Sequence, residues 1–480
     1  MFYRARQRRT FTRTDSRRGG NDFMEGISPR VVMLPWSAQG HISPYLELAK
    51  KLSARNFQVF FCSSTVNLTF IKEQLLPKAG EEDRSCSLIE LVDLNCPSLP
   101  SLPQHLHTTN GLPPHLIPKL MELLDLCVPN ILNTLRSLNP NLFIYDFNFP
   151  WHLLSSEERS LFSSIPAIFF QTGSALTLSC NLHSVISPRV SYPFPVFGGA
   201  APPPWNSRNP APHHDIDDSV KRFLSNIQRS SQIILIKTSK EIEDKYIDFL
   251  SALTVKKVVP VGALVHEEGH EQGADEEMMG WLDQKEDSTT VYVSLGSEVY
   301  LTEEEMGELG HGLELSGVNF VWVVRFPKGE GMSMDEALPR GFLERTRGRG
   351  LVVEGWAPQV RILKHPAIGG FVSHCGWNSM LESIKFGVPI IAMPMHLDQP
   401  TNAKLAEDVG VGLEIKGDAE GRFERKAIAK TVREVVFGEV GEQVRRKAGA
   451  VRKRFEERER EEMDDVVAEL HRLCFSTIID

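Results

Sequence analysis

A histidine and an aspartate follow two apolar runs in the first half of the chain. His41 closes the segment Trp36–His41 after the run Val31–Pro35, and Asp146 follows the run Leu142–Tyr145. A histidine can act as a general base near neutral pH, and a carboxylate on its other ring nitrogen would fix its tautomer and stabilise the imidazolium. His41 and Asp146 are therefore a candidate catalytic pair. On spacing alone, the plainer alternative is favoured, in which His41 caps a helix and Asp146 ends a strand.

A candidate anion site lies in the segment Ser373–Ser379, which runs from a predicted strand through Gly376 into a predicted helix. Backbone N–H groups and the dipole at a helix N-terminus attract phosphate, and a glycine lets the backbone approach closely. Asn378 and Ser379 could cap the first turn, and Ser297, after another predicted strand, could add a hydroxyl. The alternative is an ordinary capped strand-to-helix turn.

Trp356 also follows a predicted strand, where an exposed indole could stack on a base. Core packing is the default explanation for a tryptophan. Metal sites have little support. The segment His266–His270 fits H-E-x-x-H but contains Gly269 in an acidic linker, where helicity is poor. Asp215 and Asp217 suit a helix start better than a metal. We expect no metal.

Apolar runs that alternate with helical segments must position these residues. In the first half, the run Val31–Pro35 precedes a helix over 44–54 with Pro44 in its first turn, and further strands are expected at 58–62, 142–145, 167–170 and 232–236. In the second half, strands are expected at 258–265, 290–295, 320–324, 351–353, 370–373 and 389–393, and helices at 303–315 and 378–386. This alternation predicts an α/β protein with two Rossmann-like domains that face each other across a cleft, with ligands at the carboxyl ends of strands.

We place the hinge at 255–280, which divides the chain into a domain at 24–255 and a domain at 256–480. An acidic linker is expected at 267–277. Eight prolines between residues 188 and 212 predict a long loop. The tail, about 442–473, is expected to be a charged helix whose run 452–462 is a solvated face with i, i+4 pairs.

Charge and composition exclude several classes of function. The net charge of −9 and the pI near 6.0 argue against a nucleic-acid partner. Residues 1–23 carry seven arginines against Asp15 and Asp22, and we interpret them as a disordered basic extension. Seven cysteines without a C-x-x-C pair predict reduced thiols. Because 18 consecutive uncharged apolar residues never occur, we expect no membrane span and a cytoplasmic protein.

The 44 residues from Trp356 to Gln399, WAPQVRILKHPAIGGFVSHCGWNSMLESIKFGVPIIAMPMHLDQ, resemble the signature of plant family 1 UDP-sugar-dependent glycosyltransferases. The resemblance extends from about Ile27 to Leu473. It implies the GT-B fold, with the acceptor substrate bound mainly by the first domain and the UDP-sugar by the second. It also implies inversion at the anomeric carbon without a metal or other cofactor. We expect a monomer whose partners are these two small molecules.

The resemblance also implies roles for individual residues. His41 would be the base and Asp146 its paired acid, which makes the catalytic pair the favoured interpretation. The UDP-sugar would be bound by three groups of residues: Trp356, Ala357, Gln359 and Glu382 for the nucleoside; Ser297, His374, Asn378 and Ser379 for the pyrophosphate; and Trp377, Asp398 and Gln399 for the sugar. Gln399 at the end of the signature resembles a preference for glucose.

Two stretches, Leu106–Pro114 and Trp322–Pro327, look like the subgroup that adds a sugar to a sugar already on a plant metabolite. This implies transfer to a flavonoid or terpenoid glycoside. The segment Trp151–Ser160 departs from the usual Pro-Trp-Ala-Pro pattern, with His152 and Leu153 in place of Ala and Pro. Transfer to an aglycone hydroxyl is the alternative, and a non-catalytic UDP-sugar binder or a Rossmann oxidoreductase is less favoured.

Overall fold

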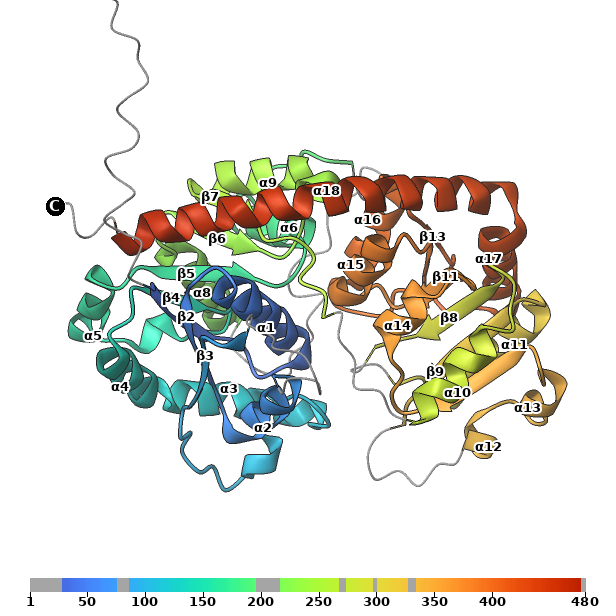
Figure 1. The fold of residues 1–480 in the computed structure, drawn as a ribbon, viewed down its shortest axis with the longest axis horizontal. Coiled ribbons are helices and arrows are strands. Elements are labelled where there is room, and N and C mark those ends of the chain that lie inside the picture. Colours follow the sequence, from blue (N-terminus) through green and yellow to red (C-terminus); the bar gives the residue numbers. More distant parts are fainter. Residues whose placement is uncertain are drawn as a thin grey trace, which may run out of the picture.

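The structure, a computed structural model, describes residues 28–75, 86–195, 216–266, 273–296, 300–326 and 334–475. They form two parallel sheets in separate halves of the molecule, each covered by helices (Figure 1). We call the half with the first sheet the first domain and the other the second domain. The expected basic extension at 1–23 and residues 196–212 of the expected proline-rich loop lie outside the described residues.

The first domain is built on a seven-stranded parallel sheet in the order β3-β2-β1-β4-β5-β6-β7. Strands β4 and β6 are buried along their whole length, as expected for strands covered on both faces. The strands are β1 (Arg30–Leu34), β2 (Gln58–Ser63), β3 (Ile89–Asp93), β4 (Leu142–Tyr145), β5 (Ala167–Gln171), β6 (Ile233–Ile236) and β7 (Lys257–Pro260).

The second domain is built on a six-stranded parallel sheet in the order β10-β9-β8-β11-β12-β13. The two domains therefore repeat one architecture, and the expected α/β fold with two Rossmann-like domains is confirmed. The strands are β8 (Thr290–Ser294), β9 (Asn319–Val324), β10 (Gly350–Glu354), β11 (Ile368–Ser373), β12 (Ile390–Ala392) and β13 (Gly412–Glu414).

Each sheet reverses its strand order once. In the first sheet β1 lies beside β4, with Leu34 opposite Tyr145, and in the second β8 lies beside β11, with Ser294 opposite Ser373. Ligands of such sheets bind outside the carboxyl ends of the strands at the point of reversal. The segments that follow these four strands contain most of the candidate site residues.

The region between the domains differs from the expected hinge in two details. Strand β7 pairs with β6 in the first sheet, so the strand just after residue 256 packs with the 24–255 segment. It ends at Pro260, because Gly262 and Leu264 adopt positive φ angles. Residues 273–277 of the expected acidic linker are helical and form the start of α10. Residues 267–272 of that linker lie outside the described residues.

Helix α1 begins earlier than its sequence indicated. It starts at Gln39, so Pro44 is its sixth residue and not part of its first turn. The helices of the first domain are α1 (Gln39–Ser53), α2 (Thr65–Gln74), α3 (Ile117–Leu126), α4 (Val128–Leu138), α5 (Ser156–Ser160), α6 (Ala175–Ile186), α8 (Ile216–Arg229) and α9 (Lys240–Thr254).

The helices of the second domain are α10 (Gly273–Leu282), α11 (Glu303–Ser316), α12 (Met334–Ala337), α13 (Phe342–Arg345), α14 (Gln359–Lys364), α15 (Trp377–Phe386), α16 (Gln399–Val409), α17 (Arg425–Phe437) and α18 (Glu439–Phe475). None of the described helices is long and apolar enough to cross a membrane.

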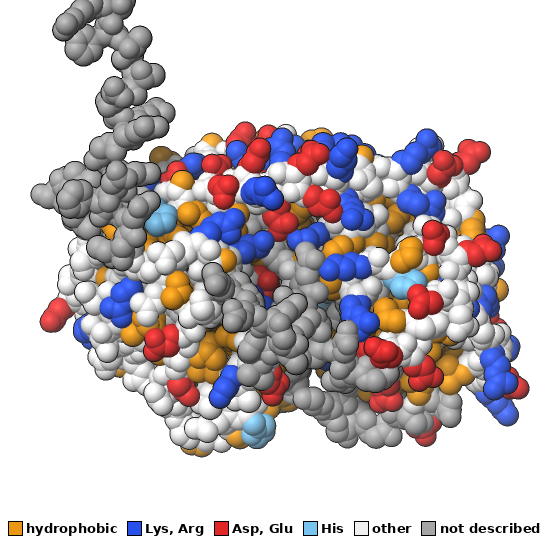
Figure 2. All heavy atoms as spheres, in the orientation of Figure 1, with side chains coloured by type: hydrophobic (Ala, Val, Ile, Leu, Met, Phe, Trp, Pro, Cys, Tyr) orange, Lys and Arg blue, Asp and Glu red, His pale blue; other side chains and the backbone are white. Residues whose placement is uncertain are grey.

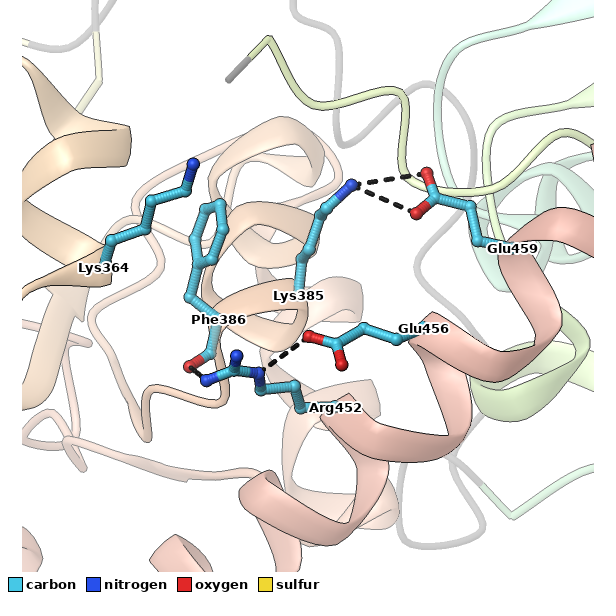
Figure 3. A pocket seen from close by; sticks show the side chains of 6 residues that line it. All are labelled: Lys364, Lys385, Phe386, Arg452, Glu456 and Glu459. Atoms are coloured by element: carbon cyan, nitrogen blue, oxygen red, sulfur yellow. Dashed lines mark hydrogen bonds and ion pairs between the residues drawn. The ribbon is translucent and has the colours of Figure 1, made fainter. Parts of the chain in front are cut away.

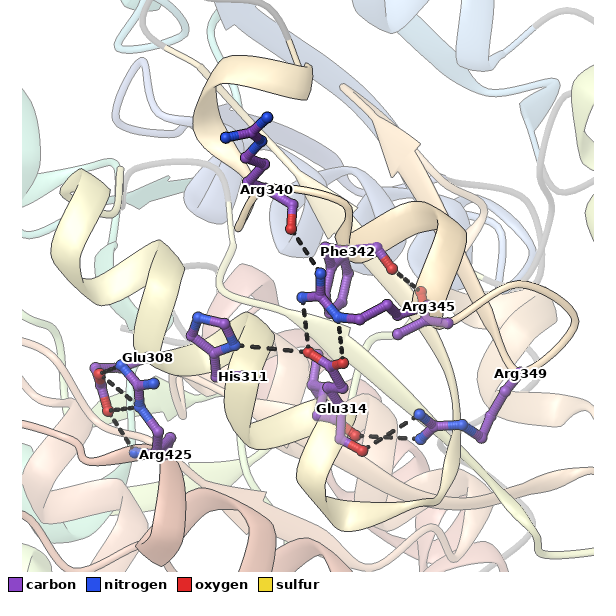
Figure 4. Close-up of polar contacts among 10 residues, drawn as sticks. Glu308, His311, Glu314, Arg340, Phe342, Arg345, Arg349 and Arg425 are labelled. Carbon is purple, nitrogen blue, oxygen red and sulfur yellow. Dashed lines mark hydrogen bonds and ion pairs between the residues drawn. The ribbon is translucent and has the colours of Figure 1, made fainter.

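Ion pairs at the outer side of the second domain join its helices. Glu308 of α11 pairs with Arg425 of α17, and Glu314 of α11 receives two hydrogen bonds from Arg345 of α13 (Figure 4). The pKa of Glu314 is lowered, chiefly by its hydrogen bond to Arg345. These pairs are partly exposed, so each adds little to stability.

The expected C-terminal helix is α18, which runs from the second domain across the first (Figure 1). Its outer face is charged, with cations and carboxylates interspersed along the edge of the molecule (Figure 2), and Arg452 pairs with Glu456 at 2.9 Å as the spacing predicted. Its inner face is buried: Met463, Val466 and Leu470 join the apolar cluster that contains Val31 of β1.

The run 452–462 of α18 is not solely a solvated face. Phe455 is buried, and Glu459 bonds Lys385 of α15. A cavity of about 340 Å³ lies where this part of α18 meets α14 and α15 (Figure 3), and it is lined by Lys364, Lys385, Phe386, Arg452, Glu456 and Glu459.

Candidate active site

The predicted catalytic pair is assembled where the first sheet reverses. His41 Nδ1 lies 2.8 Å from Asp146 Oδ2. The aspartate is buried, whereas the histidine side chain keeps a quarter of its surface exposed. The backbone N–H groups of Trp36 and Phe147 also donate to the two carboxylate oxygens, at 2.9 and 2.7 Å. The carboxylate is therefore held rigidly against one nitrogen of the imidazole.

This geometry sets the tautomer of His41. Because a carboxylate accepts hydrogen bonds, Nδ1 carries the hydrogen and Nε2 carries the lone pair that a general base needs. Thr172, just after β5, places its Oγ1 3.0 Å from the same Nδ1. Of the plainer alternative, one part is wrong, because Ala38 is the N-cap of α1 and the His41 ring contacts Asp146. The other part holds, because Asp146 directly follows β4.

The predicted anion turn follows β11, beside the end of β8. Two glycines enclose the His374 ring. A Cβ atom on Gly296 would lie 2.6 Å from the ring Nε2, and one on Gly376 would also collide with it. Burial, the largest influence, lowers the pKa of His374 to about 4, so the ring is neutral at pH 7. Its buried Nδ1 has no hydrogen-bond partner among the described residues.

Asn378 and Ser379 do not cap α15, which corrects the predicted caps. Gly376 occupies the N-cap position and makes no side-chain cap bond. Asn378 Oδ1 accepts from Lys237 Nζ at 2.5 Å, and Asn378 Nδ2 donates to Gly40 O at 3.1 Å. Ser379 Oγ accepts from Gln359 Nε2 at 3.2 Å. Both side chains therefore bond residues outside α15 and not the backbone of its first turn.

The residues expected to hold the nucleoside lie together beside α15. Gln359 Nε2 donates to Glu382 Oε2 at 2.6 Å. Burial is the largest influence on Glu382, and its pKa is raised. The Trp356 side chain is 73% exposed, so it does not pack in the core and can act as a stacking platform, whereas Ala357 is buried.

The three residues expected to hold the sugar each make hydrogen bonds to other residues of the protein. Trp377 is buried and its Nε1 donates to Lys237 O at 2.6 Å. Asp398 Oδ2 accepts from Asn402 Nδ2 at 2.8 Å. Gln399 Oε1 accepts from two backbone N–H groups, those of Met395 and His396. Ser297 lies outside the described residues.

Sequence reasoning missed three residues that contact the candidate site residues or join the two domains. Thr172 and Lys237 directly follow the apolar strands β5 and β6, so the strand-end rule could have selected both. Asn402 lies inside α16, and its position carried no signal. Its Oδ1 accepts from Ser174 Oγ of the first domain at 3.0 Å, and its Nδ2 donates to Cys375 O.

The structure also bears on the disfavoured metal motifs. His266 Nδ1 contacts Glu47 Oε1 at 2.7 Å, while His270 lies outside the described residues. Helix α8 begins at Ile216, which places Asp217 in its first turn as expected. Asp215 also lies outside the described residues.

Comparison with known protein families gives two matches. Residues 244–441 match the family described as "UDP-glucoronosyl and UDP-glucosyl transferase". Residues 28–142 match the family described as "Glycosyltransferase, N-terminal domain". The first of these matches covers most of the second half of the chain, and the other lies in the first half.

Curated proteins and solved structures agree with this. The chain is 46% identical to UDP-glucosyltransferase 29 of Panax ginseng over 92% of this chain and 96% of that protein. It is 44% identical to beta-D-glucosyl crocetin beta-1,6-glucosyltransferase of Gardenia jasminoides, over 93% and 99% of the two chains. The structure of Phytolacca americana UGT2 complexed with UDP-2fluoro-glucose and pterostilbene is similar, with a TM-score of 0.74, 27% identity, and coverage of 93% of this chain and 100% of that one.

Proposed function

Because this chain belongs to the UDP-glycosyltransferase family, we propose that it extends the sugar of a glycoside. In this proposal, glucose passes from UDP-glucose to a sugar hydroxyl of a plant flavonoid or terpenoid glycoside. The GT-B fold and glycosyl transfer follow from the family. The identity of the acceptor substrate and the role of each residue belong to the proposal.

The observation that carries the mechanism is the bond between His41 and Asp146. His41 Nε2 takes the proton of the acceptor hydroxyl, whose oxygen attacks the anomeric carbon. The bond from that carbon to the UDP oxygen breaks, and UDP leaves with the electron pair, which inverts the configuration. Asp146 stabilises the imidazolium through the 2.8 Å contact at Nδ1.

The second domain would bind the UDP-sugar. Trp356 stacks on uracil, Ala357 contacts it through the backbone, and Gln359 with Glu382 holds the ribose. The anion turn receives the pyrophosphate at the N-terminus of α15, where the helix dipole favours negative charge. His374, Asn378, Ser379 and Ser297 would contact the phosphates, and Trp377, Asp398 and Gln399 the glucose.

The relatives of this chain support a metabolite glycoside as the acceptor substrate. A small apolar pocket of the first domain, lined by residues that include Leu34, Trp36, Leu120 and Cys127, has a volume of about 20 Å³ and is too small to hold such a molecule. The segment Leu106–Pro114 borders this region, because Thr109 N donates to Ser37 O at 2.8 Å. The Gardenia relative is named for transfer to a glucosyl crocetin, which favours a glycoside over an aglycone.

The remaining expectations are part of the same proposal. The reaction proceeds without a metal or other cofactor, because backbone dipoles and side chains of the anion turn stabilise the leaving UDP. The enzyme acts as a cytoplasmic monomer without a membrane span. The net charge of −9 argues against a nucleic-acid partner.

The test is to incubate the purified protein with UDP-glucose and EDTA. Flavonoid and triterpenoid aglycones and their monoglucosides are offered in parallel, and products are identified by mass spectrometry. Transfer to the monoglucosides alone is expected. Transfer to aglycones alone would remove the sugar-extending assignment but keep the enzyme class, and activity lost in EDTA would contradict the metal-free mechanism.

A further inference from the structure

Lys237 is a buried lysine between the two domains. It directly follows β6, and only 2% of its surface is exposed. Both the N–H and the C=O group of its backbone are hydrogen-bonded. Lys237 N donates to Gln171 O at 2.8 Å, and Lys237 O accepts from Trp377 Nε1 at 2.6 Å. The side chain therefore starts from a rigid point at the rim of the first sheet, beside α15 of the second domain.

The charge of Lys237 is not matched by a bonded carboxylate. Its Nζ donates to Asn378 Oδ1 at 2.5 Å, and within the described residues no other acceptor or ion-pair partner contacts it. An ammonium group has three donors, and a buried charge without a counterion is costly. Burial lowers its pKa to about 8, although Glu382 and Glu47 favour the charged form. Such a site is suited to an anionic ligand.

The amide of Asn378 is oriented by the first domain at both ends. Its Oδ1 faces Lys237, so its Nδ2 faces Gly40 O at 3.1 Å. That carbonyl is available because the residue four positions on, which would normally donate to it within α1, is Pro44 and has no N–H. One hydrogen of Nδ2 bonds Gly40, and the second remains to donate to a ligand at the start of α15.

We propose that Lys237 is a binding residue of the UDP-sugar site, where its ammonium and the amide of Asn378 together hold the pyrophosphate. The inference rests on the proposed function and extends the anion turn with a cation from the opposite domain. The positive charge neutralises the pyrophosphate in the bound state and stabilises the negative charge that UDP gains when its bond to the anomeric carbon breaks.

The position of Lys237 indicates that it binds the pyrophosphate and not the uridine part of the nucleotide. Asn378 lies in the first turn of α15, where the N–H groups and the dipole attract anions. Glu382, expected to hold the ribose, is one turn further along the same face. Because Lys237 Nζ bonds Asn378, the lysine supplies charge at the end of the nucleotide that carries the phosphates.

The test compares the binding of UDP and of uridine, which lacks phosphate, by calorimetry or by ligand-observed NMR. The variants are Lys237→Met, which keeps the length of the side chain, and Lys237→Arg, which keeps the charge. Lys256→Met is the control, because Lys256 is a partly buried lysine that donates to Ser230 O at 2.6 Å but precedes β7, at the amino ends of the strands and away from the proposed site. Thermal melts verify folding.

We expect Lys237→Met to weaken UDP binding by about tenfold to a hundredfold, the range for hydrogen bonds to charged groups. Uridine binding should stay within about twofold, Lys237→Arg should recover part of the loss, and Lys256→Met should resemble the wild type. Equal loss for UDP and uridine, or a lower melting temperature with unchanged UDP binding, would show a structural role and overturn the inference. A wild-type protein that binds no UDP would instead contradict the proposed function.

Discussion

The two domains are prepared for chemistry in different ways. On the first-domain side, the Asp146 carboxylate accepts hydrogen bonds from His41, Trp36 and Phe147, so the catalytic pair is complete within the chain. On the second-domain side, the buried Nδ1 of His374 has no partner among the described residues. The first side is built to move a proton, and the second is built to be completed by a ligand.

This difference predicts that the two sides can be separated by measurement. Changes around His41 should alter the rate of transfer at constant nucleotide affinity. Changes around His374 and Asn378 should alter nucleotide affinity first. A variant of one side that produces the other phenotype would contradict this division.

The largest effect is expected for His41→Ala. Loss of the base should lower kcat by about 10²- to 10⁴-fold, the usual contribution of general-base catalysis. The dissociation constant for UDP, measured by calorimetry, should be unchanged. Transfer at the wild-type rate would remove the proposed mechanism while leaving UDP binding intact.

Asp146→Asn should lower kcat by about 10²-fold, at the low end of that range because the imidazole remains. The new amide NH₂ would face a backbone N–H or the Nδ1–H of His41, which misorients the ring. Thr172→Val is a matched comparison, since it removes a neutral hydroxyl 3.0 Å from the same nitrogen. A Thr172→Val variant slower than Asp146→Asn would show that the hydroxyl, and not the carboxylate, fixes the base.

Gly376→Ala tests the other side. The backbone of Gly376, with φ −58° and ψ 140°, suits any residue, so the only cost is the collision of the new methyl group with His374. We expect the dissociation constant of UDP to rise about tenfold, which corresponds to the lower part of the cost of overpacking. Gly307→Ala in α11, where a methyl group meets no atom within 4 Å, is the control and should bind UDP normally. Unchanged UDP affinity in Gly376→Ala would argue against a phosphate site at this turn.

The smallest effect is expected from pH. Because burial lowers the pKa of Lys237 to about 8, its positive charge is present below pH 8 and is lost above it. Bound UDP favours the charged form, so the affinity for UDP should fall by about fivefold between pH 7 and pH 9. The pKa of Glu47 lies below its ordinary value, so this carboxylate stays ionised over the range and cannot produce the change. Lys237→Met should show a flat profile, and an equal slope in both proteins would assign the titration to another group.

Much of this site could be predicted because it follows from the topology of parallel sheets. His41, Asp146 and His374 all follow buried apolar strands, and these runs are visible in the sequence. The same rule applied to β6 would have found Lys237. In contrast, Asn402 contacts Ser174 of the first domain from within α16, where no local pattern distinguishes it from other polar helix residues.

The errors have local physical causes. The start of α1 was misplaced because Gln39, Gly40 and His41 carry no helix-start signal, and Ala38 at the N-cap provides no side-chain cap. Asn378 and Ser379 were expected to cap α15 because their residue types favour that role. Lys237 and Gln359, both distant in sequence, compete for these side chains, and such partners are invisible before the fold is known.

Helix α18 has a consequence for biosynthesis. The apolar cluster that contains Val31 of β1 is covered by Met463, Val466 and Leu470, which are translated after all described strands of both sheets. Domains usually fold as units during synthesis, the N-terminal one first. Here the first domain emerges early but cannot cover that face until α18 has been translated. We therefore expect the nascent first domain to expose an apolar surface that chaperones recognise, and a stop codon before residue 463 to impair the half of the enzyme that is made first.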